Sequence, residues 1–237
     1  MTTSATLSKH IAVIPARAGS KRLKNKNLKL LQHKALIEWT VLAAIEANVF
    51  DRIIVSTDSE TIAMVASKAG AEIPFMRPAS LACDHSTPVD VGLDLLASLQ
   101  PENYSTLTWL QPTSPLRTGS DIVAAHQAYR DRQANCVISV CECEHSPLWA
   151  GQLPQDGSMQ DLIQNQVQTK RSQELPSYYR LNGAIYIVDT NKFIEQGTFH
   201  LSGDKTFAYK MPQQRSIDID TQWDFDLAEF LLARGQS

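Results

Sequence analysis

The chain has 237 residues, of which 43% are hydrophobic and 20% are charged. This is the composition of a globular protein, and the length is enough for one large hydrophobic core that needs no disulfide or metal to hold it. The net charge of −3 argues against a general nucleic-acid binder, because such proteins are usually strongly basic.

The first ten residues, MTTSATLSKH, lack the apolar core of a signal peptide, and no stretch of the chain reaches the length of a membrane span. We therefore expect a cytoplasmic protein that has no membrane partner. The cysteines form no C-x-x-C pair, and we expect them to be small buried residues rather than zinc ligands. They are Cys83, Cys136, Cys141 and Cys143.

The first predicted strand, Ile11–Ile14, is a continuous apolar run that ends at Pro15. Such runs are typical of strands covered on both faces, and ligands of open α/β sheets bind beyond the carboxyl ends of these strands. The small residues 18–20 let backbone N–H groups approach phosphate oxygens closely. The cations of the same loop are Arg17, Lys21, Arg22, Lys24 and Lys26. The loop predicts a site for a ligand with several negative charges, although a solvated basic turn or a nucleic-acid patch has a similar composition.

Strands and helices alternate between the basic loop and residue 143. The expected strands are Arg52–Val55, Ala71–Phe75, Leu107–Leu110 and Cys136–Cys143, and the expected helices are Ala35–Asn48, Glu60–Ala69, Pro88–Leu99 and Asp121–Arg130. Thr57 or Asp58 is expected to cap the helix that starts at Glu60. The alternation predicts an α/β fold: a single Rossmann-like domain with a mostly parallel sheet and right-handed crossovers.

Two polar loops follow predicted strands at the edge of the sheet where a ligand would bind. The first carries Arg77 and Asp84, which can pair with each other or contribute to a nucleotide pocket. The second, Gln111–Arg117, contains two prolines that fix its backbone, so it can hold Gln111 and Arg117 in fixed directions.

The alternation stops between Glu144 and Tyr179, a segment rich in glutamine. Irregular segments of this length inside a compact domain usually carry function, form a lid or contact a partner. Its hydrophobic residues favour an arm ordered by another subunit over disorder; they are Trp149, Leu153, Leu162 and Ile163. We expect one domain over residues 8–237, with residues 144–180 as its arm. Two more strands, Gly183–Val188 and Thr206–Met211, are expected after the arm.

Near the end of the chain, Asp218 and Asp220 alternate with Ile217 and Ile219. Residues two apart in a strand share a face, so the carboxylates are expected on one side and the isoleucines in the core. The carboxylates can converge on one hard cation, and without a cation their repulsion raises one pKa. An edge strand with two solvated acids is the alternative. A final helix, Gln222–Ala233, is expected to follow.

The basic loop indicates a polyphosphate ligand, and the paired carboxylates indicate Mg²⁺. Together they predict phosphoryl or nucleotidyl transfer, in which catalysis consists of positioning and charge neutralisation. This prediction requires the two ends of the chain to meet, so that Lys21 and Asp220 face one cleft. These residues do not identify the base of the nucleotide or the acceptor.

Seven short motifs occur in the order seen in bacterial CMP-N-acylneuraminate synthetases, and the resemblance covers nearly the whole chain from Ile11. In chain order they are IPARAGSKRLKNKN, VSTD, RP with LACD, QPTSPLRT, HSPLW, YYRLNGAIYI and SIDIDT. The resemblance implies a nucleotidyltransferase domain with a smaller dimerisation arm, and hence a homodimer. It also implies the reaction of CTP with a sialic acid to give the CMP-sugar and pyrophosphate.

In the enzymes that the chain resembles, the basic loop holds the triphosphate. The resemblance assigns this role to Arg17 and Lys21 with Ser20, while Lys26 and Asn27 close the loop. The anomeric hydroxyl of the sugar would attack the α-phosphorus of CTP in line, and Arg17 and Lys21 would neutralise the leaving pyrophosphate.

The resemblance assigns the nucleoside and the metal to later segments. Arg77 and the region from Asp84 to Thr87 correspond to the part that reads cytosine and ribose. Asp218 and Asp220 correspond to the Mg²⁺ ligands, and Asp220 is expected to be catalytic. Whether one or two ions bind stays open.

The sugar contacts implied by the resemblance come from the strands in the middle and second half of the chain. Gln111 corresponds to the residue that contacts the sugar, with Asn182 and Tyr186 beside it and Phe199 packing on the acyl group. Legionaminic or pseudaminic acid is an alternative acceptor to N-acetylneuraminic acid. A metal-dependent glycosyltransferase with a D-x-D motif and a catalytically silent nucleotide sensor are the alternatives outside this reaction.

Two positions in the arm depart from the family pattern. Trp149 stands where some family members have lysine, so the charge contributed across a dimer can differ. Ser172 stands where an arginine usually precedes Gln173, and Arg171 is the candidate to replace that arginine as a substrate contact.

Overall fold

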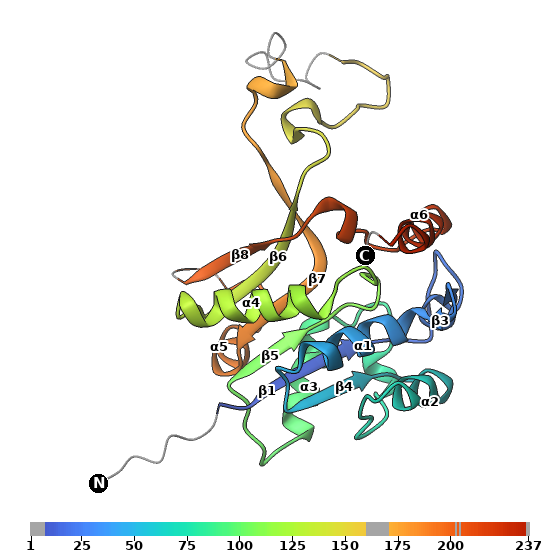
Figure 1. Cartoon of the computed structure of the whole chain (residues 1–237), viewed down its shortest axis with the longest axis vertical. Helices are drawn as coiled ribbons and strands as arrows, with labels where there is room; N and C mark the ends of the chain where they lie inside the picture. Colours follow the sequence, from blue (N-terminus) through green and yellow to red (C-terminus); the bar gives the residue numbers. More distant parts are fainter. Residues whose placement is uncertain (1–7, 160–170, 202, 204, 236–237) are drawn as a thin grey trace.

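The computed structural model describes residues 8–159, 171–201, 203 and 205–235. A six-stranded sheet forms its centre in the order β4-β1-β5-β7-β6-β8, and a separate hairpin consists of β2 and β3 (Figure 1). The strands are β1 (His10–Pro15), β2 (Leu30–Leu31), β3 (Lys34–Ala35), β4 (Arg52–Ser56), β5 (Thr106–Trp109), β6 (Cys136–Glu142), β7 (Tyr179–Asp189) and β8 (Thr206–Lys210). The helices are α1 (Leu36–Ala47), α2 (Glu60–Lys68), α3 (Pro88–Ser98), α4 (Gly119–Asp131), α5 (Thr190–Gln196) and α6 (Gln222–Ala233).

The sheet is mostly parallel, as the sequence predicts. β1 pairs in parallel with β4 and β5, and β6 pairs in parallel with β8. β7 is the exception, because it runs antiparallel to β5 and β6 on either side. The carboxyl ends of β1, β4 and β5 therefore lie at one edge of the sheet, which brings the loops that follow them together.

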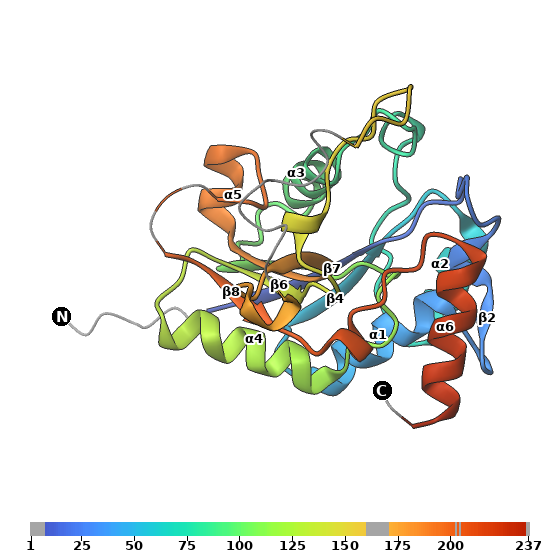
Figure 2. The same ribbon diagram turned by 90° about the horizontal axis from the view of Figure 1, so that it is seen from above.

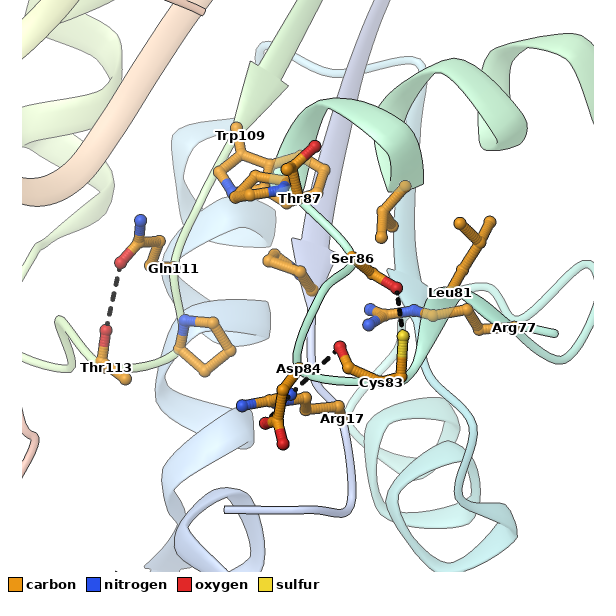
Figure 3. A pocket seen from close by; sticks show the side chains of 14 residues that line it. Arg17, Arg77, Leu81, Cys83, Asp84, Ser86, Thr87, Trp109, Gln111 and Thr113 are labelled. Atoms are coloured by element: carbon orange, nitrogen blue, oxygen red, sulfur yellow. Dashed lines mark hydrogen bonds and ion pairs between the residues drawn. The ribbon is translucent and has the colours of Figure 1, made fainter. Parts of the chain in front are cut away.

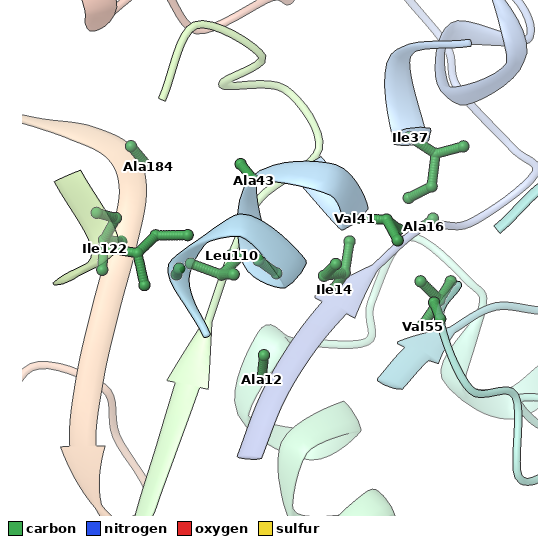
Figure 4. Close-up of a cluster of buried hydrophobic side chains, with 14 of the residues drawn as sticks. Ala12, Ile14, Ala16, Ile37, Val41, Ala43, Val55, Leu110, Ile122 and Ala184 are labelled. Atoms are coloured by element: carbon green, nitrogen blue, oxygen red, sulfur yellow. The ribbon is translucent and has the colours of Figure 1, made fainter. Parts of the chain in front are cut away.

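Helices cover both faces of the sheet, and the alternation of side chains along β1 shows how. Ala12 and Ile14 pack in a cluster with residues of α1, α2 and α4 (Figure 4). Ile11 and Val13 pack on the other face with residues of α3 and α5, and Figure 2 shows these two helices opposite α1 and α4. All four side chains are 0% exposed, and each contributes about 1.5–3 kcal/mol by leaving water. The run Ile11–Ile14 is therefore a strand buried on both faces.

A third hydrophobic cluster joins the two ends of the chain. Leu31 and Leu36, next to the β2-β3 hairpin, pack with Ile219 and with Phe225 of α6. Leu116, from the loop after β5, completes the contact. This cluster fixes the segment before α6 against the basic loop.

The predicted strand Ala71–Phe75 is wrong. The structure has one isolated bridge there, in which Val55 N donates to Glu72 O at 3.0 Å and Glu72 N donates to Ile53 O at 2.8 Å. The next residue whose N–H would continue the ladder is Pro74, which has none. The pairing therefore ends after one residue.

The prediction that Asp218 and Asp220 lie in a strand is also wrong. Residues 216–220 lie outside the sheet, and among their backbone bonds Ile219 N donates to Thr113 O at 2.8 Å. The alternation of faces nevertheless holds, because Ile219 is buried and Ile217 is partly buried in the third cluster. A segment outside a sheet can still alternate buried and exposed side chains when one of its faces packs on a hydrophobic cluster.

Short elements escaped the sequence analysis. The hairpin strands have two residues each, and α5 has seven, too few to show a periodicity. Thr221 caps α6 by accepting a bond from Asp224 N, so the predicted end helix is confirmed. None of the helices in the described part of the chain has the length and apolar character needed to span a bilayer.

The irregular segment lies between the end of β6 at Glu142 and the start of β7 at Tyr179, and Figure 1 shows it projecting away from the sheet. Its described parts contain two 3-10 turns, Pro147–Trp149 and Ser172–Glu174. Residues 160–170, with Leu162 and Ile163, lie outside the described residues. The role of residues 144–180 as a dimerisation arm and the domain limits 8–237 stay predictions.

Candidate active site

Two neighbouring recesses open at the carboxyl ends of β1 and β5. The first, here called the Arg77 recess, has a volume of ≈ 260 Å³, and the second, the Lys21 recess, has a volume of ≈ 420 Å³. Both are lined by Pro15, Arg17, Pro112 and Thr113. The shared wall makes them two parts of one cleft that lies beyond the strands, where open α/β sheets bind ligands.

The Lys21 recess brings together the two ends of the chain. Its lining residues besides the shared ones are Ser20, Lys21, Arg22, Leu23, Lys26, Asn27 and Asp220. Lys21 and Asp220 thus face the same space, which is the arrangement that nucleotidyl transfer requires of this chain.

Asp220 is held by two cations of the basic loop. Arg22 Nη1 lies 2.7 Å from Asp220 Oδ2, and Lys26 Nζ lies 3.2 Å from Asp220 Oδ1. Lys26 Nζ also donates to Ile219 O at 2.6 Å. The side chain of Lys26 is only 14% exposed, so this contact forms a partly desolvated link between the basic loop and the C-terminal segment.

Asp84 holds the other two cations of the loop. Lys21 Nζ lies 2.6 Å from Asp84 Oδ2, and Arg17 Nη1 lies 3.1 Å from Asp84 Oδ1 (Figure 3). The hydrogen bond from Lys21 and that from Arg17 lower the pKa of the Asp84 carboxyl. The alternative pairing of Arg77 with Asp84 is therefore wrong. Two protein carboxylates thus pair with the four cations that border the recess and leave an excess of positive charge there.

The backbone of the basic loop is fixed by two further side chains. Asp58 Oδ1 accepts from Ala18 N at 2.9 Å, and the buried Asn27 donates from Nδ2 to Arg17 O at 3.0 Å. Asp58 is thus used by the loop, and the predicted cap at Thr57 or Asp58 is wrong. Ser59 caps α2 instead, since its side chain accepts from the N–H of the third helical residue.

Arg77 forms the floor of the first recess. It is only 8% exposed, and it donates from Nε to Ser56 Oγ at 3.0 Å and from Nη2 to Ser56 O. Burial lowers the pKa of Arg77, the charge of Asp58 opposes this, and the charge of Arg17 lowers it further. A cation held in this way has a fixed position at the carboxyl end of β4 and can direct hydrogen bonds to a polar ligand.

The loop from Cys83 to Thr87 forms one wall of the Arg77 recess (Figure 3). Thr87 caps α3 in a reciprocal pair with Asp90, which fixes where the loop ends. Cys83 is exposed, so the expectation of four buried cysteines is wrong for it. Cys136 and Cys141 are buried, and no group of three His, Cys, Asp or Glu side chains within the described ranges could hold a metal ion.

Gln111 and Asp218 converge above Gly183. Gly183 has a φ of +75°, and a Cβ built on it would lie 3.1 Å from Gln111 Oε1 and 3.5 Å from Asp218 Oδ2. Thr113 donates from Oγ1 to Gln111 Oε1 at 3.4 Å. Only glycine combines this left-handed conformation with room for both side chains. The absence of a side chain at this position thus keeps two polar groups together beside the cleft.

The pKa of Asp218 is raised, in the direction that the sequence predicts. Asp218 is exposed as a residue, but neighbouring groups keep solvent from its carboxyl, and this desolvation is the largest cause. The nearby hydroxyl of Thr113 lowers the pKa and the charge of Asp220 raises it. The charges of the two carboxylates therefore act on each other, as the sequence predicts.

Three residues predicted near the sugar lie behind the cleft wall and line neither recess. Asn182 is 1% exposed and its amide is used within the protein: Oδ1 accepts from Ser139 Oγ at 2.6 Å and Nδ2 donates to Ser216 Oγ at 2.9 Å. Phe199 and Tyr186 are buried, with Phe199 packed 5.0 Å from Trp109 between ring centroids. Phe199 packs on Trp109, which does line the Arg77 recess, so an action of Phe199 on a ligand would pass through that side chain.

Arg171 lies on the arm and lines neither of the two recesses. It is exposed, and its backbone N–H donates to Glu174 Oε2 at 3.1 Å. The described part of one chain therefore does not bring this residue to the cleft.

Several cleft residues were missed by the sequence analysis. Trp109 and Thr113 line the Arg77 recess, and the contact of Arg22 with Asp220 was not predicted. Arg22 was visible as one cation among several, without a signal to separate it from its neighbours. Trp109 was hidden in a buried strand, because its side chain reaches the recess only through the direction that β5 gives it.

Comparison with known proteins identifies the family. The model of the cytidylyltransferase family matches residues 11–231. The chain is 37% identical over 234 residues to CMP-N,N'-diacetyllegionaminic acid synthase from Legionella pneumophila, covering 95% of this chain and 97% of that protein. It is 36% identical over 219 residues to an N-acylneuraminate cytidylyltransferase from Streptococcus agalactiae, covering 92% of this chain and 52% of that protein.

A solved structure shares the fold. It is described as a CMP:2-keto-3-deoxy-manno-octonic acid synthetase complexed with CTP, and it has a TM-score of 0.71 and 16% identity over 96% of this chain and 100% of that one. The strand order, the cleft and the family match agree with one another. The chain therefore belongs to the cytidylyltransferase family and is a nucleotidyltransferase.

Proposed function

We propose that the chain transfers CMP from CTP to the anomeric hydroxyl of a nonulosonic acid and releases pyrophosphate. One observation carries this proposal: cations of the first loop and the Asp220 carboxylate of the last segment line one recess, which shares a wall with the Arg77 recess. The names of the relatives from Legionella pneumophila and Streptococcus agalactiae, which refer to a legionaminic and a neuraminic acid, support the choice of acceptor class.

The triphosphate would bind in the Lys21 recess. Arg17 and Lys21 would exchange the Asp84 carboxylate for phosphate oxygens, which are also anionic acceptors and carry more negative charge. The backbone around Gly19 is open, since no atom lies within 4 Å of a Cβ built there. These groups would hold the leaving pyrophosphate and neutralise the charge that develops on it.

We infer that Asp218 and Asp220 hold Mg²⁺ when the nucleotide binds. The fit is supported by the chemistry of the pair: both are carboxylates, and the charge of Asp220 raises the pKa of Asp218, an effect that a bound cation would oppose. Mg²⁺ usually takes one or two protein carboxylates and completes its shell with phosphate oxygens and water. When bound, the ion would neutralise and orient the phosphate oxygens.

The nucleoside would occupy the Arg77 recess. Arg77 offers a fixed guanidinium at its floor, and Ser86 and Thr87 offer hydroxyls on its wall. Gln111 would place its amide toward the acceptor from the opposite side, where Gly183 leaves room for it. The acceptor would thus lie between the nucleoside and the Asp218 carboxylate.

We further propose that the chain is a homodimer whose arm, residues 144–180, contacts the second copy. The projection of this segment from the sheet supports the proposal (Figure 1). In a dimer the exposed Arg171 could reach the partner's cleft, which a single chain does not allow. Sedimentation of the protein with and without residues 150–175 tests the oligomeric state.

Pyrophosphate release from CTP tests the reaction. N-acetylneuraminic, N,N'-diacetyllegionaminic and pseudaminic acids serve as acceptors, and we expect turnover with at least one of them. A glycosyltransferase would release no pyrophosphate, and a nucleotide sensor would bind CTP without turnover.

A matched pair of variants ties the reaction to the cleft. Lys21→Ala should weaken CTP binding and slow the reaction, because it removes a cation that lines the recess. Lys24→Ala removes an exposed cation of the same loop that lines neither recess, and should leave both unchanged. Equal kinetics of the two variants would show that the loop does not bind the triphosphate.

A further inference from the structure

Arg117 is a buried cation that has no carboxylate partner. It is 2% exposed, it lies just before α4, and none of the ion pairs in the described part of the chain includes it. Burial lowers its pKa to about 10, with only the more distant charge of Asp121 opposing the shift. The carboxylate oxygens of Asp121 bond to Arg215 instead, at 2.8 and 2.9 Å.

The guanidinium of Arg117 lies where the β5-β7 ladder would continue. The last residues paired in the ladder are Trp109 and Tyr186. Two residues further along each strand, Gln111 and Ala184 would be the next pair whose backbone groups point toward each other. Arg117 Nη1 donates to both of their carbonyls, at 3.3 Å to Gln111 O and 3.1 Å to Ala184 O. One donor thus bridges two strands that no longer bond to each other, and it fixes the distance between them.

The gap set by this bridge is the place where the acceptor would bind. Gln111 carries the amide that faces the cleft, and Ala184 follows Gly183, whose missing side chain makes room for that amide. A change in the position of either carbonyl would move the amide relative to Asp218, which approaches the same point.

Stability alone does not account for an arginine here. Within the described residues, Nε and Nη2 of Arg117 are buried and have no hydrogen-bond partner, and each such donor lowers stability. A smaller uncharged donor could bridge two carbonyls without burying a charge. The rigid planar guanidinium, in contrast, holds the two strands at one spacing.

We propose that Arg117 is a positioning residue that sets the gap between Gln111 and Gly183 and thereby determines how the acceptor sugar acid is bound and selected. Arg117 does not touch the substrate; it acts through the backbone of Gln111. The inference rests on the proposed transfer of CMP to a nonulosonic acid.

The test compares Arg117→Lys with wild type in the pyrophosphate-release assay, with CTP and each acceptor varied in turn. A single ammonium cannot reproduce the fixed guanidinium geometry, so we expect KM for the acceptor to rise about tenfold, the effect of one charge-assisted hydrogen bond. KM for CTP should stay within about twofold, and the ratio of kcat/KM between N-acetylneuraminic and N,N'-diacetyllegionaminic acids should change.

The matched control is Arg52→Lys. Arg52 is a partly buried arginine that is paired with Glu72 and Glu102, and it lies at the amino end of β4, away from the cleft. This variant should lose thermal stability without a change in acceptor KM or selectivity. A loss of stability in Arg117→Lys that leaves acceptor KM and selectivity unchanged would overturn the proposal.

A double-mutant cycle separates an action through Gln111 from a general effect. If Arg117 acts through Gln111, Arg117→Lys should raise acceptor KM much less in a Gln111→Ala background than in wild type, and additive effects would contradict the proposal. Should Arg117→Lys fail to fold, Arg117→Gln goes through the same comparisons. If wild type releases no pyrophosphate with any acceptor, the proposed function fails; if it does and the variants are neutral toward the acceptor, only the role of Arg117 fails.

Discussion

Lys26 offers the most direct test of how the two ends of the chain are joined. Substituting methionine removes the charge and the hydrogen bonds but keeps most of the aliphatic side chain. Wild-type Lys26 Nζ lies 2.6 Å from Ile219 O and 3.2 Å from Asp220 Oδ1, with 14% of the side chain exposed. The methionine would leave the Ile219 carbonyl without its donor and Asp220 with Arg22 alone.

The expected loss follows from these contacts. A hydrogen bond to a charged group contributes about 1.5–3 kcal/mol, and the lower end applies because the Asp220 side chain is 50% exposed. We therefore expect Lys26→Met to lower the free energy of unfolding by about 1.5 kcal/mol and the Tm by about 3–6 °C. If the contact also places Asp220 for the reaction, kcat/KM for CTP should fall by about tenfold.

Urea denaturation and the pyrophosphate-release assay measure the two effects, with Lys24→Met as the control at an exposed position of the same loop. Wild-type stability in Lys26→Met would refute the reasoning, because it would mean that the hydrophobic cluster around Ile219 joins the two ends unaided. A variant with wild-type stability but a tenfold lower kcat/KM for CTP would show that Lys26 acts in the reaction and not in joining the two ends of the chain.

Asp220→Ala should lower turnover by roughly 10²–10³-fold, the scale of losing one electrostatic stabiliser, and a near-normal rate would exclude it as a metal ligand. Asp84→Asn should lower KM for CTP by a few-fold, because the triphosphate no longer competes with a carboxylate for Arg17 and Lys21; a higher KM would show that Asp84 itself contacts the nucleotide. Asp121→Asn should lower the free energy of unfolding at neutral pH by about 3 kcal/mol, since it breaks a buried pair. Burial alone would raise the pKa of Asp121, but hydrogen bonds from Arg215 and Thr118 lower it. The stabilisation by the Asp121–Arg215 pair is therefore present above the ordinary pKa of 3.8 and is lost as the pH falls through the lower pKa of the folded state. Denaturation at a series of pH values measures this loss.

The sequence predicted the architecture where long apolar runs determine it. The run Ile11–Ile14 is buried on both faces because helices from both crossovers cover β1, and its pattern carries that information. The strand predicted over Ala71–Phe75 also contains apolar residues, but Pro74 interrupts the ladder that its neighbours begin. Composition alone therefore predicted a strand where only one bridge forms, because Pro74 has no N–H to continue the pairing.

The site was predictable in its charges and less so in its contacts. The cations of the basic loop and the carboxylates at the end of the chain were recognised because charges clustered beside an apolar strand are visible in a sequence. The ion-pair partners of these charges could not be recognised, because Asp84 and Asp220 come next to the loop only in the folded chain. Asn182 lies in a matching motif, but its amide is bonded to other protein groups, and its place beside the sugar stays a prediction.

The antiparallel direction of β7 could not be predicted from the sequence, for a different reason. Its apolar run, Gly183–Val188, is the same whether the strand lies parallel or antiparallel to its neighbours. Direction depends on the connection before the strand, and that connection is the irregular arm. The fold could thus be predicted as mostly parallel, but not which strand departs from this order.

The cluster that joins α6 to the β2-β3 hairpin bears on how the protein is made. During translation the hairpin leaves the ribosome long before α6, so Leu31 and Leu36 lack their covering helix until the last part of the chain emerges. A nascent chain that already contains the whole central sheet would still expose the apolar side chains that α6 covers in the folded protein, and its cleft would lack Asp220. Chaperones that bind exposed aliphatic side chains would therefore act on this protein mainly in the interval before its final helix docks.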